Sequence, residues 1–208
     1  QRRLAAQVDA FVVPSRFART RLDELGAPLG GRTHVLPPVV RDFVAGSRAA
    51  GGGYVLYVGR LAAEKGVDVA IEACRRAGVE LVVAGDGPLR AELAGARFVG
   101  PVADAELAGL RAGASLAVVP SRAAETFGLA AAEAMAAGLP VAGSRVGALP
   151  ELVDEEGLVT PGDPGALAAA VGRLWGDAAA GERALGRARE LVAPEVVAPR
   201  LAAIYGSL

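Results

Sequence analysis

Short apolar runs alternate with helix-like segments along most of this chain, and this alternation constrains the fold more than any other feature. The predicted strands are residues 54–58, 80–84, 97–99, 116–119 and 140–142. The predicted helices between them are residues 67–77, 89–94, 104–112 and 127–137. Such alternation indicates an α/β fold, in which a parallel sheet is covered by helices on both faces.

The segments on either side of this region follow different patterns. Residues 9–14 read as a strand, after which Ser15 is placed to cap a short helix that ends near Gly26. Residues 33–38 are expected to be extended, and the proline- and glycine-rich stretch 37–53 resembles a connection between domains. The C-terminal part, residues 163–205, is helical in pattern, with breaks expected at Gly181 and Pro194.

Charge and cysteine content narrow the functional class. The formal net charge of the 208 residues is -1 and the pI is about 6.0, which argues against a nucleic-acid partner. Cys74 is the only cysteine, so an intrachain disulfide is impossible and a reducing compartment is favoured. With no apolar run long enough for a bilayer, we expect a cytoplasmic protein. The start at Gln1 suggests a piece of a longer chain.

The loops that follow the predicted strands hold the unusual residues of the chain. Those loops are residues 59–66, 85–88, 100–103, 120–126 and 143–147. In a parallel sheet they all emerge at one edge, which is where such folds bind ligands.

The first of these loops carries two cations between two glycines. Gly59 and Gly66 allow sharp turns and close approach of a ligand, while Arg60 and Lys65 suit a diphosphate. Lys65 is also the only lysine in the chain. The alternative is a solvated loop in which Glu64 pairs with one of the cations, and the spacing alone does not decide between the two.

The second loop is a Gly-Asp-Gly turn. Asp86 is expected to cap the helix 89–94, a structural role, and Pro88 suits its first turn. Gly85 and Gly87 leave room above the strand end for a base or a sugar. This segment does not fit the three-glycine dinucleotide fingerprint.

The most informative segment is residues 120–135, which contains two glutamates eight positions apart. A helix starting near Phe127 would aim free N–H groups into the ligand crevice. Glu125 stands just before that helix and Glu133 lies about two turns later, so the two carboxylates can bind hydroxyls on separate parts of one ligand. A surface position is the commoner fate of a glutamate. The small apolar face 129–137 argues against that for Glu133, because an acid there needs a partner.

The remaining candidate residues give weaker evidence for a functional site. Loop 143–147 is polar and is expected to shape the pocket, whereas His34, the only histidine, is not expected to be catalytic. No spacing typical of a metal site or of a Ser/His/acid triad is present in the sequence.

Taken together, the motifs resemble those of the family-four retaining glycosyltransferases, which have two Rossmann-like domains in the GT-B arrangement. The resemblance covers nearly the whole chain. It is carried by Gly59-Arg60-Leu61 with Glu64-Lys65-Gly66, Gly85-Asp86-Gly87-Pro88, Phe98-Val99-Gly100, Glu125-Thr126-Phe127-Gly128-Leu129 and Glu133-Ala134-Met135-Ala136-Ala137-Gly138-Leu139-Pro140-Val141.

The resemblance implies a role for each matching position. Arg60 and Lys65 would hold the donor diphosphate, Glu133 the ribose hydroxyls, and Glu125 the transferred sugar together with the backbone of residues 127–129. The catalytic set is then Arg60, Lys65 and Glu125. The donor-binding set is Gly59, Gly85, Gly87, Val99, Gly100, Phe127, Gly128, Leu129 and Glu133.

The resemblance also implies a division of the chain and a reaction. Residues 1–45 would be the end of an acceptor-binding domain with the linker, and residues 46–208 the nucleotide-sugar donor-binding domain. The implied reaction moves a hexosyl group from a UDP-, GDP- or ADP-sugar to an acceptor, with retention at the anomeric carbon, no cofactor and no metal. The acceptor would be bound through the missing part of the N-terminal domain, and the full-length enzyme could associate with a membrane surface.

Three other interpretations stay open at this point. A phosphorylase-like enzyme would need Lys65 for pyridoxal phosphate, although that lysine lies in the predicted diphosphate loop. A nucleotide-sugar epimerase matches the Glu125 motif less well. The non-enzyme alternative is a nucleotide-sugar-binding module, or a subunit that another chain completes.

Overall fold

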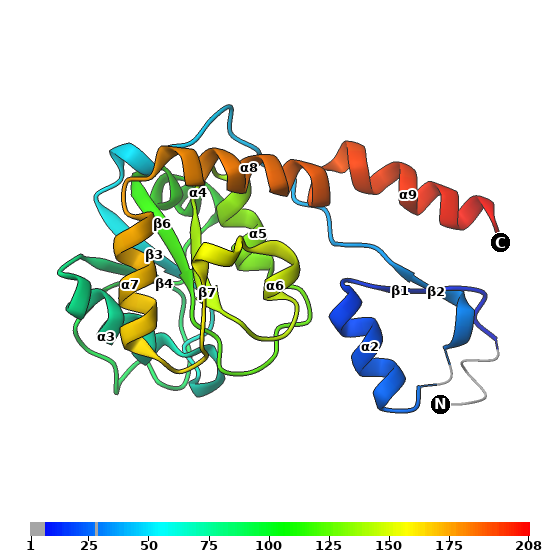
Figure 1. Cartoon of the computed structure of the whole chain (residues 1–208), viewed down its shortest axis with the longest axis horizontal. Coiled ribbons are helices and arrows are strands. Elements are labelled where there is room, and N and C mark those ends of the chain that lie inside the picture. Colours follow the sequence, from blue (N-terminus) through cyan, green and yellow to red (C-terminus); the bar gives the residue numbers. More distant parts are fainter. Residues whose placement is uncertain (1–6, 28) are drawn as a thin grey trace.

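The computed structural model describes residues 7–27 and 29–208, which form a small N-terminal unit and a larger α/β body (Figure 1). In the N-terminal unit, β1 (Phe11–Val13) and β2 (Thr33–Val35) pair in parallel as a two-stranded sheet, with α2 (Arg16–Glu24) between them in sequence. Ser15 caps α2 as predicted, because its side chain accepts a hydrogen bond from the Ala18 N–H.

The body is built on a six-stranded sheet in the order β5-β4-β3-β6-β7-β8, with every pair parallel. The strands are β3 (Tyr54–Val58), β4 (Leu81–Ala84), β5 (Arg97–Gly100), β6 (Ala114–Val119), β7 (Val141–Ser144) and β8 (Leu158–Val159). This sheet confirms the predicted α/β class and the five predicted strands. The short β8 and the one-turn helix α6 (Leu149–Leu152) were not predicted.

Helices cover both faces of the sheet, and neighbouring strand residues point to opposite faces. Along β3, Leu56 packs on the side of α5 (Leu129–Ala136) and α8 (Ala178–Val192), whereas Val55 and Tyr57 pack on the side of α3 (Val67–Ala77) and α7 (Pro164–Leu174). Figure 1 shows α3 and α7 on one side of the strands and α5 on the other. The body therefore has two apolar layers separated by the sheet.

The strand order places a topological switch point between β3 and β6. From β3 the chain moves outward to β4 and β5, and it then returns through α4 (Asp104–Gly113) to β6 on the other side of β3. The loops after β3 and β6 leave in opposite directions along the sheet, which opens a crevice between them.

The helix predicted at 89–94 is wrong, since residues 88–92 form successive turns. The Leu89 N–H bonds to the carbonyl of Leu61 in the loop after β3, and the Arg90 N–H bonds back to Gly87. These amides are bound before a helical ladder can form, so Asp86 has no helix to cap. Its carboxylate instead accepts the N–H of Gly87 at 2.8 Å.

The break predicted at Gly181 is also wrong, because this glycine is buried inside α8. A Cβ at residue 181 would lie 2.0 Å from Ser47 Oγ and 2.6 Å from the Gly138 carbonyl oxygen. The glycine is needed for close packing, not for a turn. The break at Pro194 is confirmed, because α9 (Pro194–Gly206) starts there as a separate helix.

Two connections join the N-terminal unit to the body. The linker after β2 bonds to α8 through the Val40 N–H and the Val192 carbonyl, and to the end of α5 through the Val44 N–H and the Ala136 carbonyl. At the other end of the chain, α9 continues outward from α8 and reaches over the N-terminal unit (Figure 1). Within residues 7–27 and 29–208, no helix is long and apolar enough to span a bilayer.

Candidate functional site

A pocket of about 180 Å³ opens at the carboxyl ends of β3 and β6, at the switch point. Its lining brings together six of the predicted site residues, namely Gly59, Arg60, Lys65, Glu125, Gly128 and Leu129. Tyr57 and Ser121 also line it. Residues far apart in the sequence therefore meet where the topology alone predicts a ligand site.

Backbone contacts fix the two loops that form this pocket. The Glu64 carbonyl accepts the N–H groups of Arg122 at 2.8 Å and Ala123 at 3.2 Å, so the loop after β3 is bonded to the loop after β6. Gly66 has a φ of 66° and lies so close to Pro120 that a Cβ would be 2.1 Å from the proline carbonyl oxygen. The pocket wall is thus set by the main chain rather than by mobile side chains.

Lys65 and Glu125 form an ion pair across the pocket. Lys65 Nζ lies 2.7 Å from Glu125 Oε1, and that oxygen also accepts a 2.6 Å hydrogen bond from Ser121 Oγ. The side chains of Lys65 and Glu125 are 33% and 18% exposed, so the pair is partly shielded from water. Both hydrogen bonds fall on Oε1, and Oε2 takes part in neither of them.

Arg60 pairs with Glu64, four residues along the same loop. This is the pairing that the solvated-loop alternative predicts, but Arg60 also lines the pocket next to Lys65. The Tyr57 hydroxyl donates to the Arg60 carbonyl at 3.0 Å. Burial raises the pKa of the Tyr57 phenol well above its usual range, and the charges of Glu125 and Glu64 raise it further, so the phenol remains a hydrogen-bond donor.

Glu133 has a different partner and lines a different pocket. Its carboxylate pairs with Arg111 of α4, whose side chain is only 15% exposed. Both residues line a cavity of about 550 Å³ between α4, α5 and the linker. The sequence suggested that the two glutamates contact one ligand, but in the structure they line different pockets.

Both pockets are nevertheless lined by residues from one face of α5. The helix starts at Leu129, two residues later than predicted, with Gly128 in a left-handed conformation (φ 98°) before it. The side chains of Leu129, Ala130 and Glu133 are exposed or half-buried and form a stripe along the helix, whereas the other residues of α5 are buried. Leu129 and Ala130 line the smaller pocket and Glu133 the larger, so one extended ligand along this stripe can reach both acids.

The other predicted donor-binding residues lie outside the smaller pocket's lining. Gly85 and Gly87 pack against the loop after β3, where a Cβ would lie 2.0 Å from the Gly59 oxygen and 2.5 Å from the Leu61 oxygen. Gly100 accepts the Gly85 N–H, and Val99 packs against the apolar layer that contains α5. Phe127 is buried and lines a third pocket beside the N-terminal unit.

Sequence reasoning missed three side chains that build the site: Arg111, Ser121 and Tyr57. The need for a partner to Glu133 was visible in the sequence, but nothing there selects Arg111 among so many arginines. Ser121 lies inside the motif that was singled out, four residues before Glu125, and this spacing is the only signal for its role. Tyr57 is on the strand and gave no signal.

The arrangement suits a polar, negatively charged ligand. Two cations and the start of α5 face the pocket at the switch point, and carboxylates lie beside them. In the described part of the chain, no group of three or more His, Cys, Asp or Glu side chains is placed to hold a metal ion.

A protein-family model described as "Glycosyl transferases group 1" matches residues 52–177, more than half of the chain. The chain belongs to the group 1 glycosyltransferases. This membership and the fold confirm the resemblance to the family-four enzymes and to the C-terminal, donor-binding half of the GT-B arrangement.

Two curated relatives of this glycosyltransferase come from Mycobacterium tuberculosis. One is a GDP-mannose-dependent alpha-(1-6)-phosphatidylinositol dimannoside mannosyltransferase, which is 38% identical over 190 residues, covering 81% of this chain and 50% of the relative. The other is a glycogen synthase, 39% identical over 166 residues, covering 71% and 40%. The chain thus spans about half the length, or less, of these relatives.

Two solved structures show the same fold. Sucrose-phosphate synthase from Thermosynechococcus elongatus superposes with a TM-score of 0.81 at 31% identity, covering 96% of this chain and 58% of that one. Anabaena HepE in complex with UDP superposes with a TM-score of 0.82 at 22% identity, covering 97% and 64%.

Proposed function

We propose that this chain binds a nucleoside diphosphate sugar and supplies the donor half of a hexosyltransferase that retains the anomeric configuration. The observation that carries this proposal is the pocket at the switch point, where Arg60 and Lys65 meet Glu125 at the start of α5. Mannosyltransferase and glycogen synthase relatives, and a neighbour crystallised with UDP, support a nucleotide-sugar donor.

In this proposal the two cations act on the leaving group. As the bond to the sugar breaks, the diphosphate gains negative charge, and fixed positive groups stabilise that charge more in the transition state than in the bound donor. Arg60 turns from Glu64 towards the phosphates, and Lys65 bridges Glu125 and the diphosphate. The N–H groups at the start of α5 add to the positive potential.

The two glutamates serve as hydroxyl acceptors at the two ends of the donor. Glu125 has Lys65 and Ser121 on Oε1, so Oε2 is directed to accept from the transferred sugar. Glu133, held by Arg111 in the larger cavity, accepts from the ribose diol. In this assignment the diphosphate lies between the two carboxylates, beside Arg60 and Lys65.

The division of the chain follows from this assignment. We propose that residues 46–208 form the donor-binding domain and that residues 1–45 belong to an acceptor-binding domain with its linker. The acceptor would then be held mainly by parts of the protein outside this chain, so the chain alone binds donor and transfers little. One relative is named as GDP-mannose-dependent and one structural neighbour was crystallised with UDP, so the base is left to measurement.

Calorimetric titration with UDP-, GDP- and ADP-sugars tests the proposal. We expect one of them to bind with micromolar to millimolar affinity, and Arg60→Ala or Lys65→Ala to weaken it by roughly tenfold or more, since each charge-assisted bond contributes about 1.5–3 kcal/mol. Arg75→Ala is the matched control, because this exposed arginine pairs with Glu72 on α3. A folded protein that binds none of these donors would refute the donor-binding assignment.

A further inference from the structure

The first turn of α2 is bonded to the body rather than left to solvent. Ser15 is 3% exposed, and its hydroxyl both accepts the Ala18 N–H at 2.9 Å and donates to the Thr126 carbonyl at 2.6 Å. One buried hydroxyl therefore caps the helix and joins it to the loop after β6.

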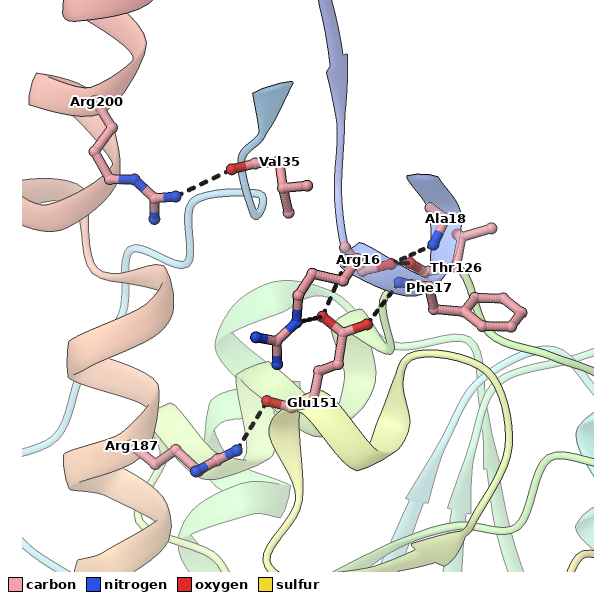
Figure 2. A network of polar contacts seen from close by, with 9 residues as sticks. Arg16, Phe17, Ala18, Val35, Thr126, Glu151, Arg187 and Arg200 are labelled. Atoms are coloured by element: carbon pink, nitrogen blue, oxygen red, sulfur yellow. Dashed lines mark hydrogen bonds and ion pairs between the residues drawn. The ribbon is translucent and has the colours of Figure 1, made fainter. Parts of the chain in front are cut away.

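Glu151 of α6 completes the contact from the other side. Its carboxylate accepts the N–H groups of Phe17 at 2.7 Å and Arg16 at 3.0 Å, and it lies 3.4 Å from the Arg16 guanidinium (Figure 2). Arg187 of α8 donates to the Glu151 carbonyl at 2.9 Å and also to that of Leu152, which holds α6 in place. Ser15, Thr126 and Glu151 are called the α2 anchor below.

The α2 anchor fixes the direction of α2, because the two ends of a helix differ in their free backbone groups and in charge. The first N–H groups of a helix have no partner within it, and a negative charge at that end is stabilised by the aligned peptide dipoles. Here the amides of residues 16 and 17 are satisfied by a carboxylate more than a hundred positions away. The N-terminal unit thus docks on the body in one orientation, with the N-terminal end of α2 at the loop after β6.

That loop carries the proposed sugar-binding group. Thr126 directly follows Glu125, whose own carbonyl accepts the Ala148 N–H at 2.8 Å from the segment leading into α6. The α2 anchor and this bond therefore hold two successive carbonyl groups, those of Glu125 and Thr126, directly after the Cα that carries the Glu125 side chain. Arg60 and Lys65, by contrast, lie on the loop after β3, which the anchor does not touch.

We propose that Ser15 and Glu151 are positioning residues for the sugar end of the donor site. Docking of the N-terminal unit through the α2 anchor fixes the Glu125 segment, so affinity for the sugar depends on that docking more strongly than affinity for the diphosphate, whose two cations lie on the loop after β3. This inference rests on the proposed donor-binding function, and the experiment below separates the two.

The experiment compares a nucleoside diphosphate with the corresponding nucleotide sugar in the 208-residue chain. Glu151→Gln keeps one acceptor and replaces the other by an NH₂ group, and Ser15→Ala removes the bond to Thr126. For both variants we expect the Kd of the nucleoside diphosphate to stay within twofold, while that of the nucleotide sugar rises by roughly fivefold, at the low end of energetic coupling between sites. Amide exchange at residues 16 and 17 should accelerate in parallel in Glu151→Gln.

Glu155→Gln is the matched control, since this exposed acid pairs with Arg145 outside the anchor and should change neither affinity. If either anchor variant does not fold, the other variant still tests the positioning role. Wild-type protein that binds neither ligand overturns the donor-binding function, and this inference with it. Wild-type protein that prefers the nucleotide sugar, with variants that lose both ligands equally or neither, overturns the positioning role alone.

Discussion

The strand-end loops of the body and the N-terminal unit are held in place by different kinds of contact. The loops after β3 and β6 are joined by backbone hydrogen bonds and by glycines that allow close approach, as at Gly66 against Pro120. The N-terminal unit is bonded to the body mostly through side chains, those of Ser15, Glu151 and Arg200. The pocket walls are thus held by the main chain of the body. The N-terminal unit, in contrast, can change its docking without unfolding of the body.

Among the variants that test this difference, Gly66→Ala is expected to have the largest effect on stability. Its φ of 66° strains any other residue, and the added Cβ would lie 2.1 Å from the Pro120 oxygen, so we expect a loss of about 3 kcal/mol or more in unfolding free energy. Gly78→Ala is the control, because Gly78 has a similar φ of 70° but nothing within 4 Å, and should cost about 1–2 kcal/mol. Urea denaturation measures both, and equal losses would show that the loop contact adds nothing.

The second test asks whether the linker is packed as tightly on α8 as the pocket loops are packed on each other. Gly181→Ala places a methyl group against Ser47 and the Gly138 carbonyl, and we expect a loss of about 1–3 kcal/mol from overpacking. Gly186→Ala on the same helix has nothing within 4 Å and should stabilise by about 0.5–1 kcal/mol, as alanine does in helices. Thermal unfolding of the pair gives the answer, and stabilisation by both would mean that the linker is not packed on α8.

A smaller effect is expected for the ion pair between Asp68, at the start of α3, and Arg122, in the loop after β6. A hydrogen bond from Arg122 lowers the pKa of Asp68 below 3.8, despite an opposing effect of burial. Because the folded pKa is depressed, the stabilisation is present above pH 3.8 and is lost as pH falls through the folded value. Both side chains are partly exposed, so Asp68→Asn should cost under about 1 kcal/mol at pH 7. Urea titrations at pH 7 and pH 2.5 check this, and a difference between wild type and variant that is as large at pH 2.5 as at pH 7 would contradict it.

The smallest global effect is expected in the N-terminal unit. Arg200 donates to the Val35 carbonyl at 3.0 Å, and Arg200→Ala should change the unfolding free energy of the body by no more than about 0.5 kcal/mol. Hydrogen exchange should nevertheless rise in residues 33–35. Arg173→Ala, which removes a similar 2.9 Å bond to the Glu156 carbonyl within the body, should leave that exchange unchanged. A cooperative loss of body stability in Arg200→Ala would show that the two regions unfold as one.

The parts of the fold that follow a local period were predictable from the sequence. Strand 54–58 and helix 67–77 have the observed bounds, because apolar periodicity and flanking glycines are local signals. The errors at 89–94 and Gly181 arise from distant groups, Leu61 in one case and Ser47 in the other. The meeting of Lys65 and Glu125 followed from the parallel-sheet argument, but the Arg111 partner of Glu133 depends on where α4 lies relative to α5.

The chain crosses between the N-terminal unit and the body twice, once through the extended linker and once through α9. A part attached by one flexible tether can swing and spin in any direction. A second attachment, here made where α9 meets β2 through Arg200, removes most twisting and leaves bending about the line that joins the two crossings. Any relative movement of the two parts is therefore a bending about that line, and it must first break the α2 anchor, which bonds the start of α2 to the body.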